Sequence, residues 1–358
     1  MYKIMQHCFG GVGTGGPVIA FERFLAHSDI RYRQIRQVAA AGGINFPLIV
    51  RFIKEIRADR PDLIHVRGLG NEGFHAVLAA RIAGVPRILL SIHGTCRDVS
   101  SPQNRVKNMI VSYMLEPLSM CMATHIATVC DAMIHRDFMA PHAGKVMGSV
   151  PNGVDLPLLA MSGSPGLRSR WGISDKSLIG ICVSRVTVDK GYFVLAEALL
   201  RIDDNVSDLA IFIVGGGDHD GIIKRKFNSL KNIKIIFTGH RDDVADFLKA
   251  SDFFIFPTLH ENLSNALIEA MSHGLPVIAT NVGGNIEVVS KGGGVLVDVG
   301  DAPALADAIL NFIVDKDSLP CVGQNARENV ECNYSLTAMV SGWEELYARI
   351  LRGGISNG

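Results

Sequence analysis

Short apolar runs of strand type alternate with longer stretches of helical periodicity along almost the whole chain. This alternation is typical of parallel sheets covered by helices and predicts an α/β fold. The first half contains runs that predict strands near 2–8, 32–38, 62–66, 87–92, 124–129 and 145–150. The pattern then starts again and predicts strands at 178–184, 210–214, 233–238, 253–257, 276–279 and 295–297. We therefore expect two doubly wound α/β domains.

The chain length and one turn-rich stretch indicate where the two domains meet. With 358 residues, the chain exceeds the size at which a single hydrophobic core usually stops growing. A turn at 151–153 is followed by an aperiodic stretch at 157–170, which is rich in Pro, Ser, Gly and Met. We predict an N-terminal domain over 1–152 and a C-terminal domain over 153–335.

Three helical stretches follow the last predicted strand, at 302–315, 323–332 and 336–352. They have no further strand of their own to cover. We therefore expect the C-terminal helix, within 336–358, to cross back and join the first domain.

Charge is distributed unevenly between the two halves, although the formal net charge of the chain is zero. Residues 1–152 carry a formal charge of +7 and residues 153–358 a formal charge of −7. A basic first half suits an anionic acceptor or a lipid surface, whereas two oppositely charged faces that meet across a cleft give the same imbalance. Both interpretations stay open, and neither requires a nucleic acid partner.

Cysteine usage and hydropathy indicate a cytoplasmic protein. The seven cysteines form no Cys-x-x-Cys pair, and their odd number argues against a disulfide framework. The first residues turn polar too early for a signal peptide. The most apolar long stretch, Met109–Cys130, is interrupted by Glu116-Pro117 and His125, so we expect no membrane span.

One apolar segment is compatible with peripheral membrane contact. Residues 109–115 are mainly apolar and follow Arg105 and Lys107. An amphipathic helix on a bilayer surface has this composition, and so does a helix packed on a sheet. Packing is the favoured interpretation, and a peripheral position at the inner face of the membrane through the N-terminal domain is the alternative.

A glycine-rich segment, 10–17, directly follows the first predicted strand and contains Gly13, Thr14, Gly15 and Gly16. Glycines allow backbone N–H groups to approach a phosphate at a helix N-terminus. The spacing also fits a dinucleotide fingerprint, but that fingerprint requires an acidic residue at the end of the second strand, which here ends in Arg36-Gln37-Val38. A phosphate or acceptor loop is favoured over NAD binding and over a plain tight turn.

His93 stands at the end of the fourth predicted strand and is followed by Gly94. Open α/β sheets bind ligands at this edge, so we consider His93 a candidate catalytic residue. A structural role for the histidine is the alternative.

Arg185 and Lys190 follow the first strand of the second domain, at the start of a predicted helix. Two cations in this position can stabilise a departing diphosphate by neutralising the charge that develops on it. The alternative is a surface ion pair of Lys190 with Asp189 or Glu197.

The segment 256–271 contains two carboxylates, Glu261 and Glu269, eight residues apart. A helical rise of about 1.5 Å per residue separates them by about 12 Å, which is too far for the acid pair of a glycoside hydrolase. The spacing suits two carboxylates that hold the sugar and the ribose of one elongated ligand, with a diphosphate at the helix N-terminus.

This segment resembles the Glu-x7-Glu motif of retaining glycosyltransferases of family 4, the group 1 enzymes of bacterial polysaccharide synthesis, which have the GT-B fold of two Rossmann-like domains. The resemblance covers nearly the whole chain, because other motifs occur in the family's order: the glycine-rich loop, His93, 152–155, Arg185 with Lys190, 214–218, 238–240 and 274–280. The segment departs from the family at Asn262-Leu263-Ser264, where Gly-Phe-Gly is common.

The resemblance implies roles for these residues. Arg185 and Lys190 contact the donor diphosphate, Glu261 the donor sugar and Glu269 the ribose. The further donor-binding candidates are Asn262, Leu263, Ser264, Asn265, Gly216, His240 and Arg241. The donor is then a nucleotide-sugar, UDP- or GDP-linked, and the acceptor a glycan or a polyprenyl-linked saccharide.

We assign no metal site in the sequence and expect neither a catalytic metal nor a cofactor. Two other functions remain open. A sugar-nucleotide epimerase shares this architecture, and a non-catalytic glycosyltransferase-like subunit usually has a broken donor motif.

Overall fold

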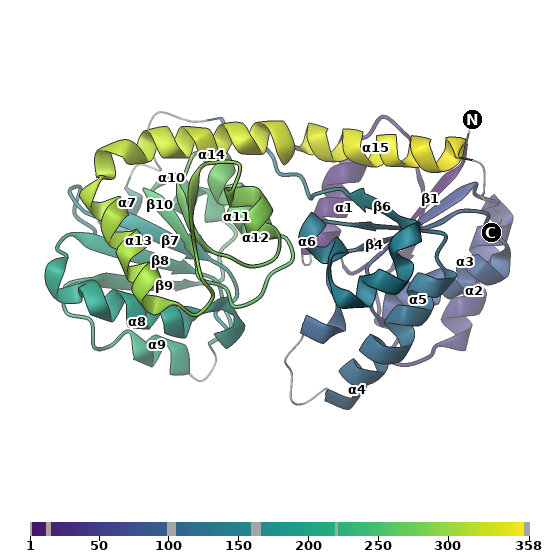
Figure 1. The fold of residues 1–358 in the computed structure, drawn as a ribbon, viewed down its shortest axis with the longest axis horizontal. Coiled ribbons are helices and arrows are strands. Elements are labelled where there is room, and N and C mark those ends of the chain that lie inside the picture. Colours follow the sequence, from purple (N-terminus) through teal and green to yellow (C-terminus); the bar gives the residue numbers. More distant parts are fainter. Residues whose placement is uncertain (1, 12–15, 99–104, 159–165, 219–220, 354–358) are drawn as a thin grey trace. The chain divides into compact units, whose positions relative to one another are not determined.

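The computed structural model describes residues 2–11, 16–98, 105–158, 166–218 and 221–353. It divides into two compact units (Figure 1). The first unit comprises Met1–Gly153 together with Leu336–Gly358, and the second unit comprises Val154–Ser335. The division between Gly153 and Val154 lies one residue from the boundary predicted from the sequence.

The first unit is built on a parallel sheet whose six described strands have the order β2-β1-β3-β4-β5-β6. Its strands are β1 (Ile4–Phe9), β2 (Arg33–Gln37), β3 (Leu63–Arg67), β4 (Ile88–Ile92), β5 (His125–Thr128) and β6 (Val146–Ser149). The central strands β3 and β4 are buried along their whole length, as expected for a parallel sheet covered on both faces.

Helices cover both faces of this sheet (Figure 1). One face carries α2 (Phe46–Asp59), α3 (Asn71–Ala83) and α5 (Glu116–Met122). The other face carries α1 (Gly16–His27) and the C-terminal helix α15 (Leu336–Arg352). The remaining described helices of the unit include α4 (Arg105–Ile110), a π-helical turn (Val111–Leu115) and α6 (Asp131–Ile134).

Helix α15 belongs to the first unit because its apolar stripe packs on that unit's sheet. Apolar side chains recur at helical spacing from Leu336 through Trp343 and Tyr347 to Leu351. They pack against β1, β3 and β4 and against Phe21 of α1. The expectation that the C-terminal helix returns to the first domain is confirmed.

The second unit is built on a parallel sheet whose six described strands have the order β12-β11-β10-β7-β8-β9. Its strands are β7 (Leu178–Val183), β8 (Leu209–Val214), β9 (Lys234–Gly239), β10 (Phe253–Phe256), β11 (Val277–Thr280) and β12 (Gly294–Val297). The chain runs from β7 to β8 and β9 on one side and then returns to β10 on the other side of β7.

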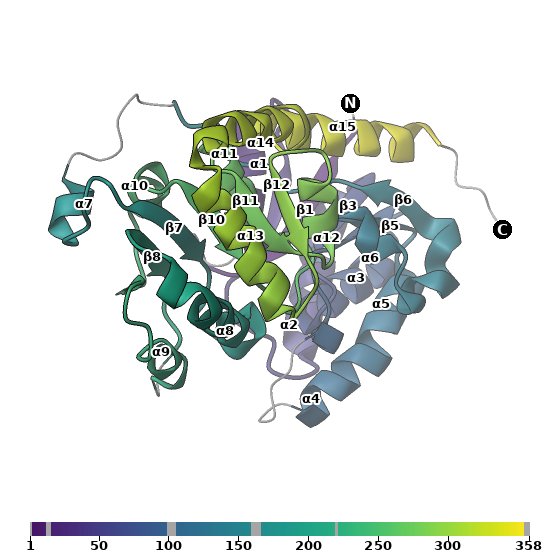
Figure 2. The ribbon, with the colours of Figure 1, turned by 60° about the vertical axis from the view of Figure 1, so that its left-hand side comes forward.

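Helices α8 (Tyr192–Ile202) and α13 (Ala302–Val314) pack side by side on one face of this sheet and form most of the core there (Figure 2). The other described helices of the unit are α7 (Leu167–Arg170), α9 (Ile222–Lys226), α10 (Val244–Lys249), α11 (Asn265–Ser272), α12 (Gly284–Val289) and α14 (Leu319–Asn333).

Each predicted strand is present in the structure, with ends that differ by at most two residues. One local expectation is wrong. The stretch 157–170, expected to be aperiodic, ends in the short helix α7. No helix in the described part of the chain is both long and apolar enough to cross a membrane.

Candidate active site

The candidate site lies at the carboxyl edge of the second unit's sheet. The loops that follow β7, β8, β9 and β10 all emerge at this edge because the strands are parallel. β7 is the point at which the strand order reverses, since β8 pairs with it on one side and β10 on the other. Ligands of open α/β sheets bind at such a switch point.

Lys190 and Glu261 form an ion pair across this switch point. Lys190 comes from the turn after β7 and Glu261 from the loop after β10, and 2.9 Å separates Lys190 Nζ from Glu261 Oε2. Their side chains are only 13% and 19% exposed. Lys190 Nζ also lies 5.6 Å from the ring centroid of Phe256. Two of the predicted site residues therefore meet in one mostly buried pair.

Glycine 191 allows the two loops to approach this closely. Its φ is +74°, and a Cβ at this position would collide with the backbone carbonyl of Pro257. The backbone N–H of Leu259 also donates to the carbonyl of Asp189 at 2.8 Å. The sequence Asp189-Lys190-Gly191 thus fixes Lys190 against the loop that carries Glu261.

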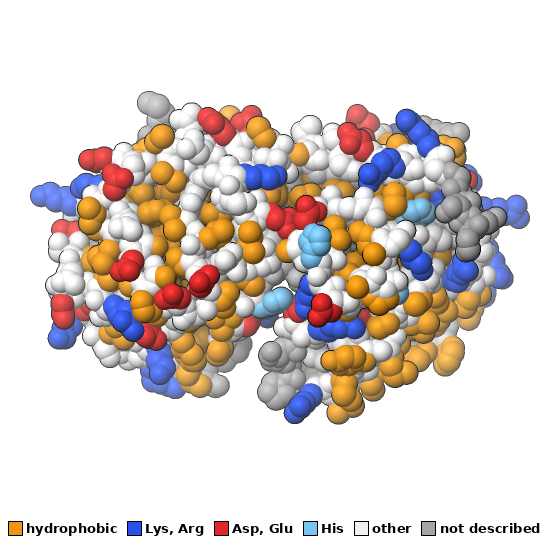
Figure 3. Space-filling model, in the orientation of Figure 1, with side chains coloured by type: hydrophobic (Ala, Val, Ile, Leu, Met, Phe, Trp, Pro, Cys, Tyr) orange, Lys and Arg blue, Asp and Glu red, His pale blue; other side chains and the backbone are white. Residues whose placement is uncertain are grey.

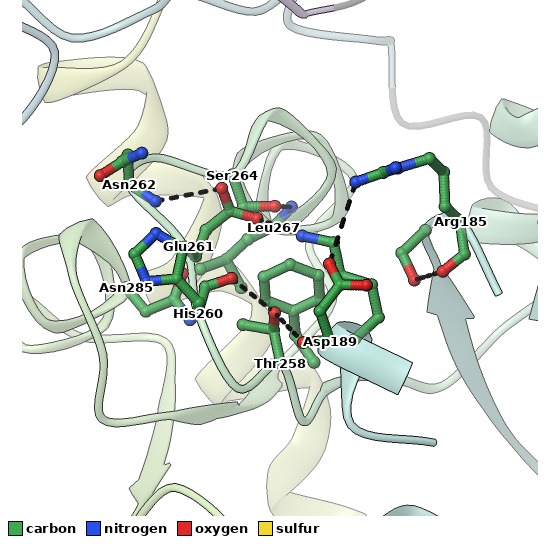
Figure 4. Close-up of polar contacts among 12 residues, drawn as sticks. Arg185, Asp189, Thr258, His260, Glu261, Asn262, Ser264, Leu267 and Asn285 are labelled. Carbon is green, nitrogen blue, oxygen red and sulfur yellow. Dashed lines mark hydrogen bonds and ion pairs between the residues drawn. The ribbon is translucent and has the colours of Figure 1, made fainter. Parts of the chain in front are cut away.

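A second glycine, Gly283, lies close to the backbone of Glu261. A Cβ at Gly283 would collide with the carbonyl oxygen of Glu261, and the N–H of Gly284 donates to the carbonyl of Asn262 at 2.6 Å. The Glu261 carboxylate accepts a further hydrogen bond, at 3.1 Å, from the backbone N–H of Asn262. Figure 4 shows Glu261 and Asn262 on the loop that leads into α11.

Arg185 is the more exposed of the two predicted cations. Its side chain is 74% exposed, and its guanidinium lies 3.9 Å from the Asp189 carboxylate, towards which it points in Figure 4. Such an exposed pair is weak in water, so the guanidinium can exchange Asp189 for another anion. The alternative pairing of Lys190 with Asp189 or Glu197 is wrong, because Lys190 pairs with Glu261 instead. Asp189 lies opposite Arg185, and Glu197 pairs with Arg201.

Helix α11 begins at Asn265, and the Ser264 hydroxyl caps it by accepting a hydrogen bond from the N–H of Leu267 at 3.2 Å. Leu263 and Ser264 are buried, so a ligand here would meet their backbone rather than their side chains.

Glu269 lies in the second turn of α11 and is partly buried. Glu261 precedes the helix, so the estimate of about 12 Å between the two carboxylates, which assumed a continuous helix, does not apply.

The loops after β8 and β9 border the same edge. Gly216 accepts a backbone hydrogen bond from Val186 at 2.8 Å, which holds the β8 loop beside the β7 loop. His240 is exposed, 3.7 Å from Asp242. Arg241 is already engaged, because its guanidinium forms two hydrogen bonds with Asp243, at 2.6 and 2.7 Å.

The remaining candidates belong to the first unit. Gly13, Thr14 and Gly15 lie outside the described residues, and Gly16 is the first residue of α1. His93 follows β4, and its Nε2 lies 3.2 Å from the Ser91 hydroxyl.

Burial, aided by the nearby positive charge of Arg67, lowers the pKa of His93 to about 3. His93 is therefore neutral at physiological pH. Arg67 itself was not among the candidates. The signal that could have identified it is a charged residue ending the otherwise buried strand of 63–67.

Metal ligands are not clustered in the described part of the chain. No group of three or more His, Cys, Asp or Glu side chains there could hold a metal ion. The positive charge at the candidate site is supplied by Lys190 and Arg185.

Two family models match the chain. The family described as "Glycosyl transferases group 1" matches residues 178–315, and the family described as "Glycosyl transferase 4-like" matches residues 24–125. The first match lies in the second unit and includes Lys190, Glu261 and Glu269.

Curated relatives extend over most of the chain. The UDP-Gal:alpha-D-GlcNAc-diphosphoundecaprenol alpha-1,3-galactosyltransferase of Escherichia coli is 28% identical over 313 residues, which cover 84% of this chain and 78% of the relative. The N-acetyl-alpha-D-glucosaminyl L-malate synthase of Bacillus anthracis is 27% identical over 294 residues, which cover 81% and 75%.

Solved structures share the fold. Sucrose-phosphate synthase from Thermosynechococcus elongatus has a TM-score of 0.78 at 20% identity and covers 98% of this chain and 99% of its own. Anabaena HepE in complex with UDP and glucose has a TM-score of 0.74 at 18% identity, with coverages of 97% and 100%. The two family models and the curated relatives support the assignment of the chain to the group 1, family 4-type glycosyltransferases, and the solved structures show the GT-B fold.

Proposed function

We propose that the protein transfers a hexose from a UDP-linked donor to a lipid-linked saccharide, with retention at the anomeric carbon and without a metal. The observation that carries this proposal is the Lys190–Glu261 pair at the switch point of the second unit's sheet. The names of two similar proteins support the choice of ligands. The Escherichia coli relative is named for UDP-Gal and a diphosphoundecaprenol acceptor, and HepE was solved with UDP and glucose.

The donor diphosphate would lie between Lys190, Arg185 and the N-terminus of α11. Bond cleavage places negative charge on the departing nucleoside diphosphate, and fixed cations and a helix dipole stabilise that charge. Lys190 is already held in place by the Glu261 loop, so little reorganisation is required. Arg185 would leave Asp189 and complete the clamp.

Glu261 would orient the donor sugar through its hydroxyl groups, and Glu269 would hold the ribose. The described part of the site offers no separate nucleophile positioned by a base, so the leaving phosphate would accept the proton of the acceptor hydroxyl. Positioning and electrostatic stabilisation would then supply most of the rate enhancement. An epimerase would act on the donor without an acceptor, and the two relatives compared above are named as a transferase and a synthase.

The acceptor would be reached at a membrane surface through the first unit. α4, the π-helical turn and α5 expose six large apolar side chains, at 45–72%: Val106, Met109, Ile110, Tyr113, Met114 and Leu118. Figure 3 shows hydrophobic side chains gathered over α4. Apolar side chains beside the exposed Arg105 and Lys107 suit the interface of an anionic bilayer.

A screen of UDP-, GDP- and dTDP-sugars by thermal shift, followed by transfer assays in EDTA, tests this proposal. We expect UDP-sugars to raise the melting temperature most, because a ligand that binds only the folded state stabilises it. We also expect transfer to a polyprenyl-diphosphate saccharide to survive EDTA. Donor conversion without any acceptor, or activity abolished by EDTA and restored by a divalent metal, would contradict it.

A further inference from the structure

Arg67 is a buried cation without a carboxylate partner. It ends β3, and its residue is only 4% exposed. In the described part of the chain no carboxylate forms an ion pair with it, and its Nη2 is buried without a hydrogen-bond partner. Burying a charge without a counter-ion is unfavourable, so a residue of this kind indicates a missing anion.

A hydrogen-bond chain from α15 fixes the other side of the guanidinium. Nη1 of Arg67 donates to Oε1 of Gln6 on β1. The Gln6 amide nitrogen lies 3.0 Å from the Tyr347 hydroxyl, which in turn lies 2.7 Å from His65 Nδ1. The Gln6 amide is thereby oriented with its oxygen towards Arg67. Nη1 of Arg67 is hydrogen-bonded, whereas Nη2 has no hydrogen-bond partner.

Three aromatic rings surround the guanidinium, but they do not replace an anion. The Arg67 Cζ lies 4.6 Å from the ring centroid of Phe21, 5.2 Å from that of Phe24 and 5.6 Å from that of Trp343. These cation–π contacts attract the charge and clamp α1 and α15 to the sheet. They offer no oxygen acceptor to Nη2, so its hydrogen-bonding capacity remains unused.

The position of Arg67 suits a ligand. β3 and β4 are neighbours, so Arg67 and His93 lie at the same carboxyl edge of the first unit's sheet. His93 is partly exposed, and its Nδ1 has no partner. The twelve-residue helix α1 begins at this edge, and the positive end of its dipole favours an anion there.

The histidines around Arg67 stay uncharged. Burial first, with a contribution from Arg67, lowers the pKa of His7 to about 4 and that of His93 to about 3. A neutral His93 can donate through Nδ1 when Nε2 accepts from Ser91. Arg67 is then the charged group of this cluster.

We propose that Arg67, with Nδ1 of His93, binds an oxyanion of the acceptor, either a phosphate or a carboxylate. This inference rests on the proposed function, since a lipid-diphosphate saccharide carries such a group. The guanidinium offers its unpartnered N–H to one oxygen of the anion, and His93 Nδ1 offers an N–H to another. The first unit therefore selects acceptors that carry a negative charge.

The test uses Arg67→Met, which keeps the volume but removes the charge, and Arg87→Met as the matched control. Arg87 is partly buried at the other end of β4 and also contacts α15, by donating to the carbonyl of Ile350. Melting temperatures are measured with saturating UDP present, so that the donor site is filled, while inorganic pyrophosphate, phosphate or malate is titrated.

We expect at least one of these anions to raise the melting temperature of the wild type and of Arg67→Lys and Arg87→Met, but not of Arg67→Met. Without anion, Arg67→Met removes an uncompensated charge but also the hydrogen bond to Gln6 and the cation–π contacts, so the response to anions is the deciding measurement. The phosphate and malate arms distinguish a phosphate site from a carboxylate site. A melting temperature that falls in Arg67→Met while its response to anions stays like the wild type's would overturn the inference and leave a packing role.

Kinetics provide a second measurement on the variants that fold. Arg67→Lys should raise the KM for a charged acceptor about tenfold or more and leave the KM for the donor unchanged. Pyrophosphate should inhibit the wild type competitively against the acceptor. Failure of UDP to shift the wild type would count against the proposed function itself, whereas a normal UDP shift with no anion effect would overturn only this inference.

Discussion

Lys190 Nζ and Glu261 Oε2 lie 2.9 Å apart, although 71 positions separate the two residues in the sequence. Under the proposed function, each of these side chains occupies a position that a group of the nucleotide-sugar donor would take. The Glu261 carboxylate stands in for a phosphate oxygen beside Lys190, and the ammonium keeps the Glu261 side chain oriented. When the nucleotide-sugar binds, the Lys190–Glu261 ion pair would be replaced by one contact of each side chain with the ligand. Neither charge would be left without a partner.

Replacing Glu261 by Gln should lower kcat by about 10²-fold or more, because a fixed charge at the reacting sugar is lost. The melting temperature should change little, since Gln can keep the hydrogen bond to Lys190. The matched control is Glu331→Gln, an exposed position on α14 of the same unit. Wild-type kcat in purified Glu261→Gln would remove Glu261 from the mechanism.

Gly283→Ala should be far more damaging than Gly300→Ala. Both glycines have positive φ, +52° and +80°, so both substitutions introduce backbone strain of about 1–3 kcal/mol. Only at Gly283 would the added Cβ also collide with the Glu261 carbonyl, whereas nothing lies near it at Gly300. Denaturant unfolding and kcat measure the two effects. Equal losses in both variants would show that Gly283 does not position Glu261.

The stability of the protein should fall as the pH drops below about 6.5. His93 has a folded-state pKa of about 3, so between pH 3 and 6.5 the unfolded state binds more protons than the folded state. Above pH 6.5 this effect of His93 no longer changes the free energy of unfolding. By pH 5 it has lowered the free energy of unfolding by on the order of 1–2 kcal/mol.

His93→Gln should therefore show a shallower loss of unfolding free energy with falling pH, whereas the exposed control His135→Gln should keep the wild-type slope. Identical slopes in all three proteins would contradict a buried, neutral His93.

Placing a charge on the exposed apolar surface of α4 and the π-helical turn should weaken membrane binding. Met109→Glu or Tyr113→Glu should reduce binding to anionic vesicles about tenfold or more, because each removes about 1–3 kcal/mol of apolar burial and adds repulsion. Val314→Glu, at an 83% exposed position in the second unit, is the control. Vesicle co-sedimentation measures the effect, and unchanged binding in both α4 variants would exclude this surface.

The fold could be predicted from the sequence because its determinants are local. Buried parallel strands such as Leu209–Val214 appear in the sequence as continuous apolar runs. The buried face of α15 can be recognised by apolar residues at helical spacing. The loop after β10 could likewise be predicted as a site, since Glu261 lies in the loop that follows a buried strand.

The partners of the site residues could not be predicted, because they depend on contacts between distant segments. From the sequence, Asp189 and Glu197 were the expected ion-pair partners of Lys190. In the structure its partner is Glu261, because Gly191 allows the two loops to approach closely. The isolation of Arg67 likewise depends on α15, which lies far away in the sequence. The π-helical turn at Val111–Leu115 has no sequence signal that separates it from an α-helix.

The central claim is that the nucleotide diphosphate binds at the carboxyl edge of the second unit's sheet, beside Lys190. Calorimetric titration of UDP into the wild type, Lys190→Ala and the exposed control Lys176→Ala tests it most directly. Loss of a charge-assisted hydrogen bond should weaken UDP about 10- to 100-fold in Lys190→Ala and leave Lys176→Ala unchanged. Equal UDP affinity in all three proteins would contradict the account.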